Sequence, residues 1–478
     1  MTWTSGPVEV HIGDALEVLA GMPDASCDAL VTDPPGAISF MGQSWDSDRG
    51  GRRQWIAWMT EVMRECLRVL KPGAHGLVWA IPRTSHWTAT ALEDAGFEVR
   101  DVVTHLFGSG FPKSLDVSKA IDKAAGAERE VVGPGQRHGG GTNGVYAQDA
   151  WTREHHGDVA PLTAPATDAA RQWQGWGTAL KPASEHWVLV RKPPSEPNVA
   201  ANVLAHGTGA IHVDACRVAT GDNLNGGAYS ADASDRWDGT ENWRYKRGQA
   251  GEYQQPAGRW PTNLVLSHAE GCWPVGTRKV ATGTAVQRNR DGEVHNEVYG
   301  AYRKPPTADA TYADPDGTET VEAWDCVDGC PVAELDRQSG RLTSGFMAAG
   351  TQREGIGYHG GLGNTVRNDT IGDSGGASRF FYVAKASTAD RNVGLPPSLR
   401  NRHSTVKPIE LMRWLCRLVT PPGGVVLDCF AGSGTTLVAA KLEGFRAIGI
   451  EQDAEWLPVI QGRVAWANHQ LSLLEEAP

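Results

Sequence analysis

The chain has 478 residues, which is enough for two or three domains with at least one large buried core. Its net charge of −11 argues against a simple nucleic-acid coat protein, since phosphate binding requires clustered Lys and Arg. The sequence shows neither a membrane-spanning apolar run nor a signal peptide, and its 8 cysteines are scattered rather than arranged as a secreted disulfide framework, so we expect a cytoplasmic protein.

The first hundred residues alternate between expected strands and helices. Apolar runs predict strands, and helical periodicity predicts helices, at 8–12 (strand), 28–32 (strand), 55–70 (helix), 76–81 (strand), 85–95 (helix) and 97–106 (strand). Such alternation requires a mostly parallel sheet that helices cover on both faces. Asp14 follows the first strand. The second strand ends in Asp33-Pro34-Pro35-Gly36, where two prolines end the strand abruptly and present Asp33 at its carboxyl end.

The periodic pattern fails beyond residue 107. Residues 133–170 are rich in Gly, Ala, Thr and Pro and indicate a long loop or an insertion. A strand at 186–192 resumes the pattern and is expected to pair with the strand that ends near Phe107. Residues 193–401 predict few long helices, so we interpret them as a separate recognition region. Within it, 236–304 combine an excess of Lys and Arg with Trp and Tyr, which fits either a DNA-facing surface or an ordinary mixed-charge surface.

A second motif lies near the C-terminus. An apolar run ends in Asp428, and a turn containing Gly432 and Gly434 leads into a helix, as at a nucleoside-binding strand-to-helix turn. The next apolar run ends in Glu451, about twenty residues after the turn, where an acidic residue could hold a ribose by its two hydroxyls. A dinucleotide fold is the competing interpretation, but Leu437 stands where its third glycine is expected, which disfavours a nicotinamide cofactor.

Together these two motifs resemble those of the amino-group DNA methyltransferases, which make N6-methyladenine or N4-methylcytosine. The catalytic Asp-Pro-Pro motif precedes the cofactor motif, which resembles the beta class, whose target-recognition region lies between the two. The resemblance implies an α/β, Rossmann-like S-adenosylmethionine-dependent fold with a mostly parallel sheet and a large, loop-rich insertion. The implied division is 1–107 (catalytic half), 108–185 (insertion), 186–192 (returning strand), 193–400 (target recognition) and 401–478 (cofactor half).

The resemblance also implies a mechanism. Hydrogen bonds from the amine of a flipped base to the Asp33 carboxylate and the Pro34 carbonyl would aim the nitrogen lone pair at the methyl group of S-adenosylmethionine. The family usually places an aromatic residue after Pro-Pro, but this chain has Gly36, so Phe40 or Trp45 would supply a stacking ring, or stacking is absent. Aspartate at position 33 favours adenine N6 over cytosine N4.

Cofactor contacts follow from the same resemblance. The glycine turn would surround the methionine and ribose portions, Glu451 would bind the ribose hydroxyls, and Asp14 would lie near the adenine. Thr405 and Lys407 would lie beside the methionine, although a surface lysine at a helix start is the alternative for Lys407. The expected cofactor-binding residues are Asp14, Thr405, Lys407, Asp428, Phe430, Gly432, Gly434, Thr435 and Glu451.

A separate group of residues suggests a metal site. His268 and Cys272 form a His-x3-Cys pair, and Cys326 and Cys330 form a Cys-x3-Cys pair. Four soft ligands in two close pairs suit a tetrahedral structural zinc, which would stabilise a region short of helical core. The alternative is reduced thiols in a loop-rich region.

The resemblance thus predicts a site-specific methyltransferase that acts on double-stranded DNA and does not associate with membranes. A homodimer and a cognate restriction endonuclease, as in a restriction-modification pair, are further expected partners. A DNA-binding module with a degenerate methyltransferase core is the competing hypothesis, and Gly36 is the feature that favours it. An RNA or small-molecule methyltransferase is disfavoured by the size of the central region.

Overall fold

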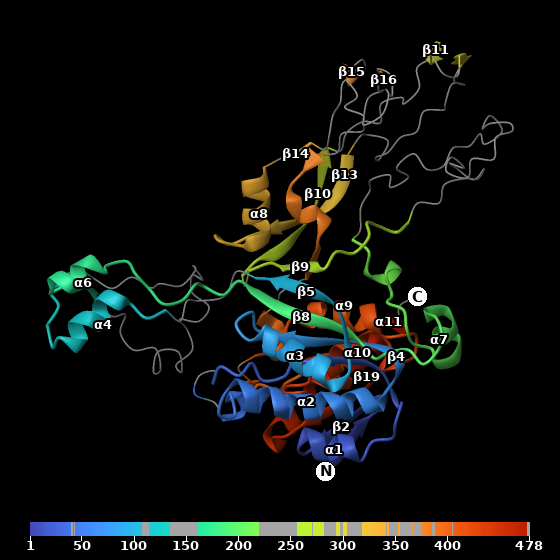
Figure 1. The fold of residues 1–478 in the computed structure, drawn as a ribbon, viewed down its shortest axis with the longest axis horizontal. Helices are drawn as coiled ribbons and strands as arrows, with labels where there is room; N and C mark the ends of the chain where they lie inside the picture. The colour runs from blue at the N-terminus through green and yellow to red at the C-terminus, as the bar shows by residue number, and fades with distance from the viewer. Residues whose placement is uncertain are drawn as a thin grey trace.

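A ten-stranded sheet forms the centre of the computed structural model (Figure 1). The structure describes residues 1–39, 42, 44–107, 114–133, 161–218, 256–269, 271–281, 293–296, 300–303, 318–340, 342–343, 352–353, 365–366, 374–384, 388–403 and 405–475. The strands of the sheet, in spatial order, are β1 (Thr2–Ser5), β2 (Val8–Ile12), β20 (Arg446–Glu451), β19 (Val425–Asp428), β3 (Cys27–Thr32), β4 (Leu70–Ala80), β8 (Ser184–Arg191), β5 (Glu98–Leu106), β9 (Leu264–Ser267) and β18 (Tyr382–Ala384).

Most neighbouring strands in this sheet are parallel. The run from β2 through β20, β19 and β3 to β4 is parallel throughout, so all five strands end at the same edge. Strand β8 is antiparallel to both β4 and β5, and its start therefore lies where its neighbours end. The predicted α/β fold with a mostly parallel sheet is confirmed, as is the pairing of the returning strand with the strand that ends near Phe107.

Helices cover both faces of the sheet, as the alternation of strands and helices predicts. The alternating residues of β3 show why: Ala29 and Val31 face one core, whereas Leu30 faces the other. The helices on the Leu30 side are α1 (Ala15–Ala20), α2 (Arg52–Val69) and α3 (Ser85–Ala95). Those on the opposite side are α9 (Ile409–Val419), α10 (Thr435–Leu442) and α11 (Leu457–Glu475).

Parts of the expected recognition region belong to the main sheet. Strands β9 and β18 lie within the range 193–400, yet they pair in parallel and extend the sheet beyond β5. Helix α7 (Val199–His206) packs against β4, where the Asn202 side chain donates to the carbonyl oxygens of Pro72 and Thr208. The sequence suggests a separate region here, because four- and three-residue strands carry too little periodicity to be assigned to a sheet.

Two units extend from the sheet in Figure 1. One contains the antiparallel pair β10 (Trp273–Ala281) and β13 (Thr318–Asp325), followed by α8 (Pro331–Ser339). Short antiparallel pairs belong to the same part of the chain: β11 (Glu293–Asn296) with β12 (Gly300–Arg303), β14 (Leu342–Thr343) with β17 (Ser374–Gly375), and β15 (Gln352–Arg353) with β16 (Thr365–Val366). The described 3-10 turns of the chain are Ser44–Asp46, Asp214–Cys216, Ala377–Phe380, Thr388–Arg391 and Ala454–Trp456.

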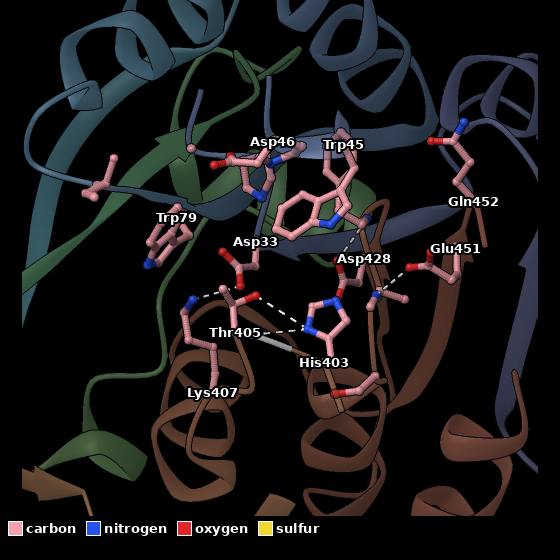
Figure 2. A pocket seen from close by; sticks show the side chains of 18 of the residues that line it. Asp33, Trp45, Asp46, Trp79, His403, Thr405, Lys407, Asp428, Glu451 and Gln452 are labelled. Atoms are coloured by element: carbon pink, nitrogen blue, oxygen red, sulfur yellow. Dashed lines mark hydrogen bonds and ion pairs between the residues drawn. The ribbon is translucent and has the colours of Figure 1, made fainter. Parts of the chain in front are cut away.

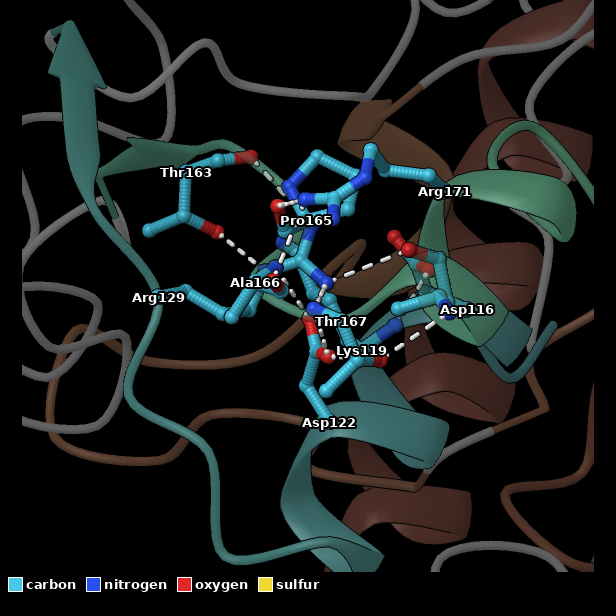
Figure 3. Close-up of polar contacts among 11 residues, drawn as sticks. Asp116, Lys119, Asp122, Arg129, Thr163, Pro165, Ala166, Thr167 and Arg171 are labelled. Carbon is cyan, nitrogen blue, oxygen red and sulfur yellow. Dashed lines mark hydrogen bonds and ion pairs between the residues drawn. The ribbon is translucent and has the colours of Figure 1, made fainter.

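The second unit, the arm, consists of α4 (Val117–Ala124), β6 (Val131–Gly133), β7 (Leu162–Thr163) and α6 (Asp168–Gln172), at the left of Figure 1. Its organising residue is the buried Asp122, whose carboxylate accepts hydrogen bonds from Arg129, Ala166 and Thr167 (Figure 3). Burial alone would raise the pKa of Asp122, but these donors outweigh it and lower the pKa to about 2. A buried carboxylate thus joins the two segments of the arm.

None of the helices in the described part of the chain combines the length and apolar character that a membrane crossing requires.

Asp28 joins three neighbouring strands at the edge of the sheet where they begin. Its buried carboxylate accepts a hydrogen bond from the Val425 amide at 2.8 Å and pairs with the Lys71 ammonium at 2.6 Å, which joins β3 to β19 and β4. We expect Asp28→Ala to lower the free energy of unfolding by about 1–3 kcal/mol, because the Val425 amide would stay buried without an acceptor. Urea unfolding measures this change. Asp28→Asn keeps one acceptor oxygen, so an Asn variant as unstable as the Ala variant would contradict this role.

Candidate active site

A cavity of 1410 Å³ lies at the edge of the sheet where the parallel strands end. Asp33 follows β3, Asp428 ends β19 and Glu451 ends β20, so the register of the parallel strands brings all three carboxylates to one place. Figure 2 shows these side chains around the same cavity. The crevice outside the carboxyl ends of the strands is the usual ligand site of open α/β sheets.

A short hydrogen bond connects the two sequence motifs. The Thr32 hydroxyl donates to the Asp428 carboxylate at 2.7 Å, across the adjacent ends of β3 and β19. The same carboxylate oxygen accepts from the Phe430 amide at 3.2 Å, which shapes the start of the glycine turn. Burial raises the pKa of Asp428, against these hydrogen bonds. The Asp-Pro-Pro motif and the glycine turn are therefore fixed relative to each other.

Lys407 contacts the carboxylate of the Asp-Pro-Pro motif. Its Nζ lies 2.8 Å from Oδ2 of Asp33 and 4.2 Å from the centre of the Trp79 ring. Burial raises the pKa of Asp33 to about 6, although the positive charge of Lys407 opposes the rise. For Lys407, burial works to lower the pKa, but the nearby carboxylates raise it overall, so the ammonium stays charged. Lys407 was expected beside the methionine, and the structure places it at Asp33.

A further carboxylate, that of Glu185, lines the cavity near the Asp33–Lys407 pair. It lies at the start of β8, and its Oε2 is 3.5 Å from Nδ1 of His105, whose Nε2 is 2.8 Å from the Ser267 hydroxyl. Burial would raise the pKa of Glu185, but Lys407 and His105 outweigh burial and lower the pKa to about 2. Glu185 is not among the residues that the sequence motifs indicate. The available signal was an acidic residue just before a strand expected to pair with the 97–106 strand; the observed pairing is antiparallel, which puts Glu185 at the cavity edge.

The loop after Pro35 brings Gly36 next to the end of β4. A Cβ atom on Gly36 would lie 3.4 Å from the Trp79 ring and 3.5 Å from Ile81, which is ordinary van der Waals contact. The loop is fixed by hydrogen bonds from the Thr84 hydroxyl to the Gly36 carbonyl at 2.8 Å and from the Ala37 amide to Asp46 at 3.0 Å.

Of the two rings considered as replacements for the missing aromatic residue, Trp45 lines the cavity. Its ring stacks on that of His403, with ring centres 6.2 Å apart. Phe40, the other residue considered, lies outside the described residues. Trp79, which sequence analysis did not consider, presents an indole ring beside Asp33 (Figure 2). Its position next to last in β4 was the available signal.

The glycine turn adopts a backbone that favours glycine. Gly432 has a φ of +52°, and a Cβ there would lie 3.0 Å from Nε2 of His403. The Gly432 amide donates to Oε2 of Glu451 at 2.7 Å. Burial raises the pKa of Glu451 to about 7, against the two amides that donate to it. The turn therefore places backbone amides and a carboxylate close together at the cavity wall.

Arg463 on α11 supports this turn from behind and was missed by sequence analysis. Its buried Nη1 donates to the Ser433 carbonyl at 2.8 Å and to the Thr435 hydroxyl at 2.9 Å, and its Nη2 donates to the Asp390 carbonyl at 3.2 Å. Burial lowers the pKa of Arg463 to about 10, against the attraction of Asp390. An arginine inside a C-terminal helix carries no sequence signal of such a role.

The structure brings most of the expected site residues into one cavity. Gly434 is the residue of the glycine turn that does not line the cavity. It caps the start of α10 with a φ of +78°, and a Cβ there would lie 3.2 Å from Ile460 of α11. The four expected metal ligands gather elsewhere, after β9 and after β13. The expected residues that line the cavity are Asp14, Asp33, Pro34, Pro35, Gly36, Thr405, Lys407, Asp428, Phe430, Gly432, Thr435 and Glu451.

The charges of the cavity differ between wall and rim. The wall holds several buried or half-buried carboxylates for the single ammonium of Lys407, an arrangement that attracts a cationic ligand. Around the cavity, Arg49, Arg83 and Arg402 are exposed and can approach phosphate groups. The site thus combines a negative interior with positive side chains that face solvent.

Comparison with known proteins identifies related sequences. Residues 240–462 match the N6/N4 methyltransferase family model, described as a DNA methylase. The type II methyltransferase M.BglI of Bacillus subtilis is 43% identical over 74 residues, which are 15% of this chain and 21% of that protein. The type II methyltransferase M1.MboII of Moraxella bovis is 44% identical over 73 residues, 15% of this chain and 25% of that protein.

These curated relatives are matched over only about a fifth to a quarter of their own length. A solved structure, the PvuII DNA methyltransferase (cytosine-N4-specific), aligns with 97% of this chain and 93% of its own at 11% identity, with a TM-score of 0.36. At that TM-score the likeness carries no argument about this chain.

Arg463 provides a test of how the turn is held. We expect Arg463→Met to weaken binding of the cofactor that the sequence predicts, S-adenosylmethionine, by about ten- to a hundredfold, because hydrogen bonds from a charged donor contribute about 1.5–3 kcal/mol. Isothermal titration calorimetry measures the affinity, and thermal melting reports folding. Arg446→Ala, at the exposed start of β20, is the matched control and should bind normally. Unchanged affinity in a folded Arg463 variant would contradict the role of this side chain.

Proposed function

We propose that this chain, a member of the amino-group DNA methyltransferase family, transfers a methyl group from S-adenosylmethionine to the exocyclic amine of a base flipped out of double-stranded DNA. The observation that carries the proposal is that Asp33 and Gly432 line one cavity, while the Thr32–Asp428 hydrogen bond of 2.7 Å joins their two strands. A methyl donor at the glycine turn and an amine at Asp33 would then be neighbours. Their proximity is what this reaction requires most.

The residues around the cavity fit S-adenosylmethionine. The glycine turn at Gly432 lines the cavity, and Glu451 at the end of β20 can accept hydrogen bonds from ribose hydroxyls. Asp14 caps α1 through the Leu16 amide at 2.9 Å and would border the adenine end. The bound cofactor would supply an electrophilic sulfonium methyl group, whose positive charge suits the carboxylate-rich wall.

Asp33 and Pro34 would orient the target amine. Its nitrogen is a poor nucleophile, since the lone pair is delocalised into the base. Hydrogen bonds from the amine to the Asp33 carboxylate and the Pro34 carbonyl would favour a tetrahedral nitrogen with its lone pair directed at the methyl group. Lys407 contacts only Oδ2 of Asp33 in the structure, which leaves Oδ1 for the substrate. After transfer, the methylated nitrogen loses one proton, and Asp33 is the nearest base.

Adenine N6 is the proposed first target, because aspartate at position 33 favours it within this family, and cytosine N4 is the second candidate. Sequencing that detects modified bases in DNA from cells expressing the chain distinguishes the two.

The exposed Arg49, Arg83 and Arg402 would contact the phosphates of the duplex. A homodimer and a cognate restriction endonuclease stay predictions, as do the 193–400 recognition region and the sequence it would read.

The competing hypothesis of a degenerate, non-catalytic core makes a different prediction. Incubation of the purified chain with radiolabelled cofactor and mixed-sequence DNA should label the DNA. Tight DNA binding without any label would favour the DNA-binding module. Retention of Asp33, Lys407 and Glu185 in one cavity supports an active enzyme, since a protein that only binds DNA has no need of buried charges at this position.

Removal of the Asp33 carboxylate tests its role. We expect Asp33→Ala to keep its affinity for S-adenosylmethionine within a few-fold and to lose at least about a hundredfold in transfer rate, because the amine loses its acceptor. Filter-binding with labelled cofactor measures transfer, and calorimetry measures affinity. Asp48→Asn, an exposed acidic residue of the same loop, should behave as wild type. Sustained turnover by Asp33→Ala would defeat the assignment.

The raised pKa of Asp33 predicts a pH dependence. Its carboxylate is a strong hydrogen-bond acceptor and a base only when ionised, so kcat/KM for DNA should fall as the pH drops through about 6, where Asp33 becomes protonated. Rates measured from pH 5 to pH 8 at saturating cofactor test this expectation. Glu451 titrates near 7, so Glu451→Gln is the control that should keep the limb near 6. A profile flat down to pH 5 would contradict the environment assigned to Asp33.

A further inference from the structure

Four soft side chains gather at the junction between the main sheet and the β10–β13 unit. His268 directly follows β9, Cys272 directly precedes β10, Cys326 directly follows β13 and Cys330 directly precedes α8. One ligand atom from each lies within 4.8 Å of all the others, and three of the four residues are buried. Two short segments separated by more than fifty residues thus meet at one point.

The two segments have the same local design. In each, a glycine in the left-handed region directly precedes the second ligand: Gly271 has a φ of +93° and Gly329 a φ of +77°. In each, the backbone amide of the second ligand donates to the carbonyl oxygen three residues earlier at 3.2 Å, from Cys272 to Ala269 and from Cys330 to Val327. Two equivalent turns that point their ends at each other are the arrangement of a paired metal knuckle, and reduced thiols in a loop give no reason for this symmetry.

The distances are close to those of a tetrahedral site. Nδ1 of His268 lies 3.4 Å from the sulfur of Cys326 and 3.4 Å from that of Cys330. Ligands about 2.3 Å from a tetrahedral metal are about 3.8 Å from one another, so only small side-chain shifts separate the two geometries. The imidazole is held by Trp324, whose ring stacks on it at 4.0 Å with a 16° angle between planes. Nδ1 is therefore already directed at the thiols.

We propose that His268, Cys272, Cys326 and Cys330 bind one structural Zn²⁺ ion that holds the β10–β13 unit and α8 to the edge of the main sheet. Three thiolates and one imidazole match the ligand preference of Zn²⁺. All four positions would be filled by protein ligands, so this ion would stabilise rather than catalyse. The site lies apart from the methyl-transfer cavity, and the proposal does not depend on the proposed function.

The metal would replace a core that the unit has only in part. Among the described residues, the apolar cluster around the site has four that are fully buried, Leu266, Cys272, Cys330 and Val332, and two of these are ligands; the apolar residues packed around them are only partly buried. A cluster this small stabilises a folded unit weakly, and structural zinc commonly supplies the missing free energy. Loss of the ion would therefore loosen β10, β13 and α8 without unfolding the main sheet, whose two larger cores are separate.

The metal content of the full-length chain tests the proposal directly. Protein purified from zinc-supplemented cells should contain one equivalent of zinc by inductively coupled plasma mass spectrometry. Replacement by Co²⁺ should give the intense visible bands of a tetrahedral, thiolate-bound ion. Zinc below a tenth of an equivalent, together with no such bands after reconstitution with Co²⁺, would overturn the proposal.

Variants assign the ligands. Cys326→Ser and His268→Ala should each lose the metal, whereas His268→Cys should retain it, with a cobalt spectrum shifted towards that of four thiolates. Cys216→Ala is the matched control, because this buried cysteine contacts the Trp414 carbonyl and lies outside the cluster. Hydrogen exchange should show faster exchange in β10, β13 and α8 when zinc is removed, with the main sheet unchanged. Full zinc retention in both Cys326→Ser and His268→Ala would also contradict the site.

Discussion

The hydrogen bond between Thr32 and Asp428 joins residues that are 396 positions apart and determines the relation between the two halves of the site. It crosses the adjacent ends of two parallel strands that are buried on both faces, where side-chain positions are restricted by dense packing. Asp33 follows the donor and the glycine turn follows the acceptor, so a shift in register between β3 and β19 would separate them. Asp28 gives the opposite end of the same strand pair a second connection through the Val425 amide.

Buried charge is concentrated around Lys407. Its ammonium contacts Asp33 and lies over the Trp79 ring. The negative charge of Glu185, on strand β8, also stabilises the ammonium. Two carboxylates that share one cation have different environments, which raises the pKa of Asp33 to about 6 and lowers that of Glu185 to about 2. Glu185 therefore remains a constant negative charge, whereas Asp33 can exchange a proton near neutral pH. Proton exchange near neutral pH fits the role proposed for Asp33.

Sequence patterns predict the parts of the site that are locally encoded. Asp33 and Gly432 could be identified because an acidic strand end and a glycine turn are short motifs, and the order of the motifs implied the fold. Glu185 was missed because its place in the cavity depends on the antiparallel insertion of β8 between β4 and β5. The contact of Lys407 with Asp33 could not be predicted, because it spans 374 positions and follows only from the packing of α9; its expected place beside the methionine stays a prediction. Strand β9 has four residues, too few for a periodicity that would join it to the sheet.

The arm closes on itself through Asp122. Its carboxylate accepts hydrogen bonds from the Arg129 side chain on the outgoing segment and from the amides of Ala166 and Thr167 on the returning one. Between Arg129 and Ala166 in the sequence, β6 pairs with β7. The two described segments of the arm, 114–133 and 161–172, are therefore tied to each other through a single ionised group. Any change that neutralises this group would act on both segments at once, so the arm responds as one cooperative element.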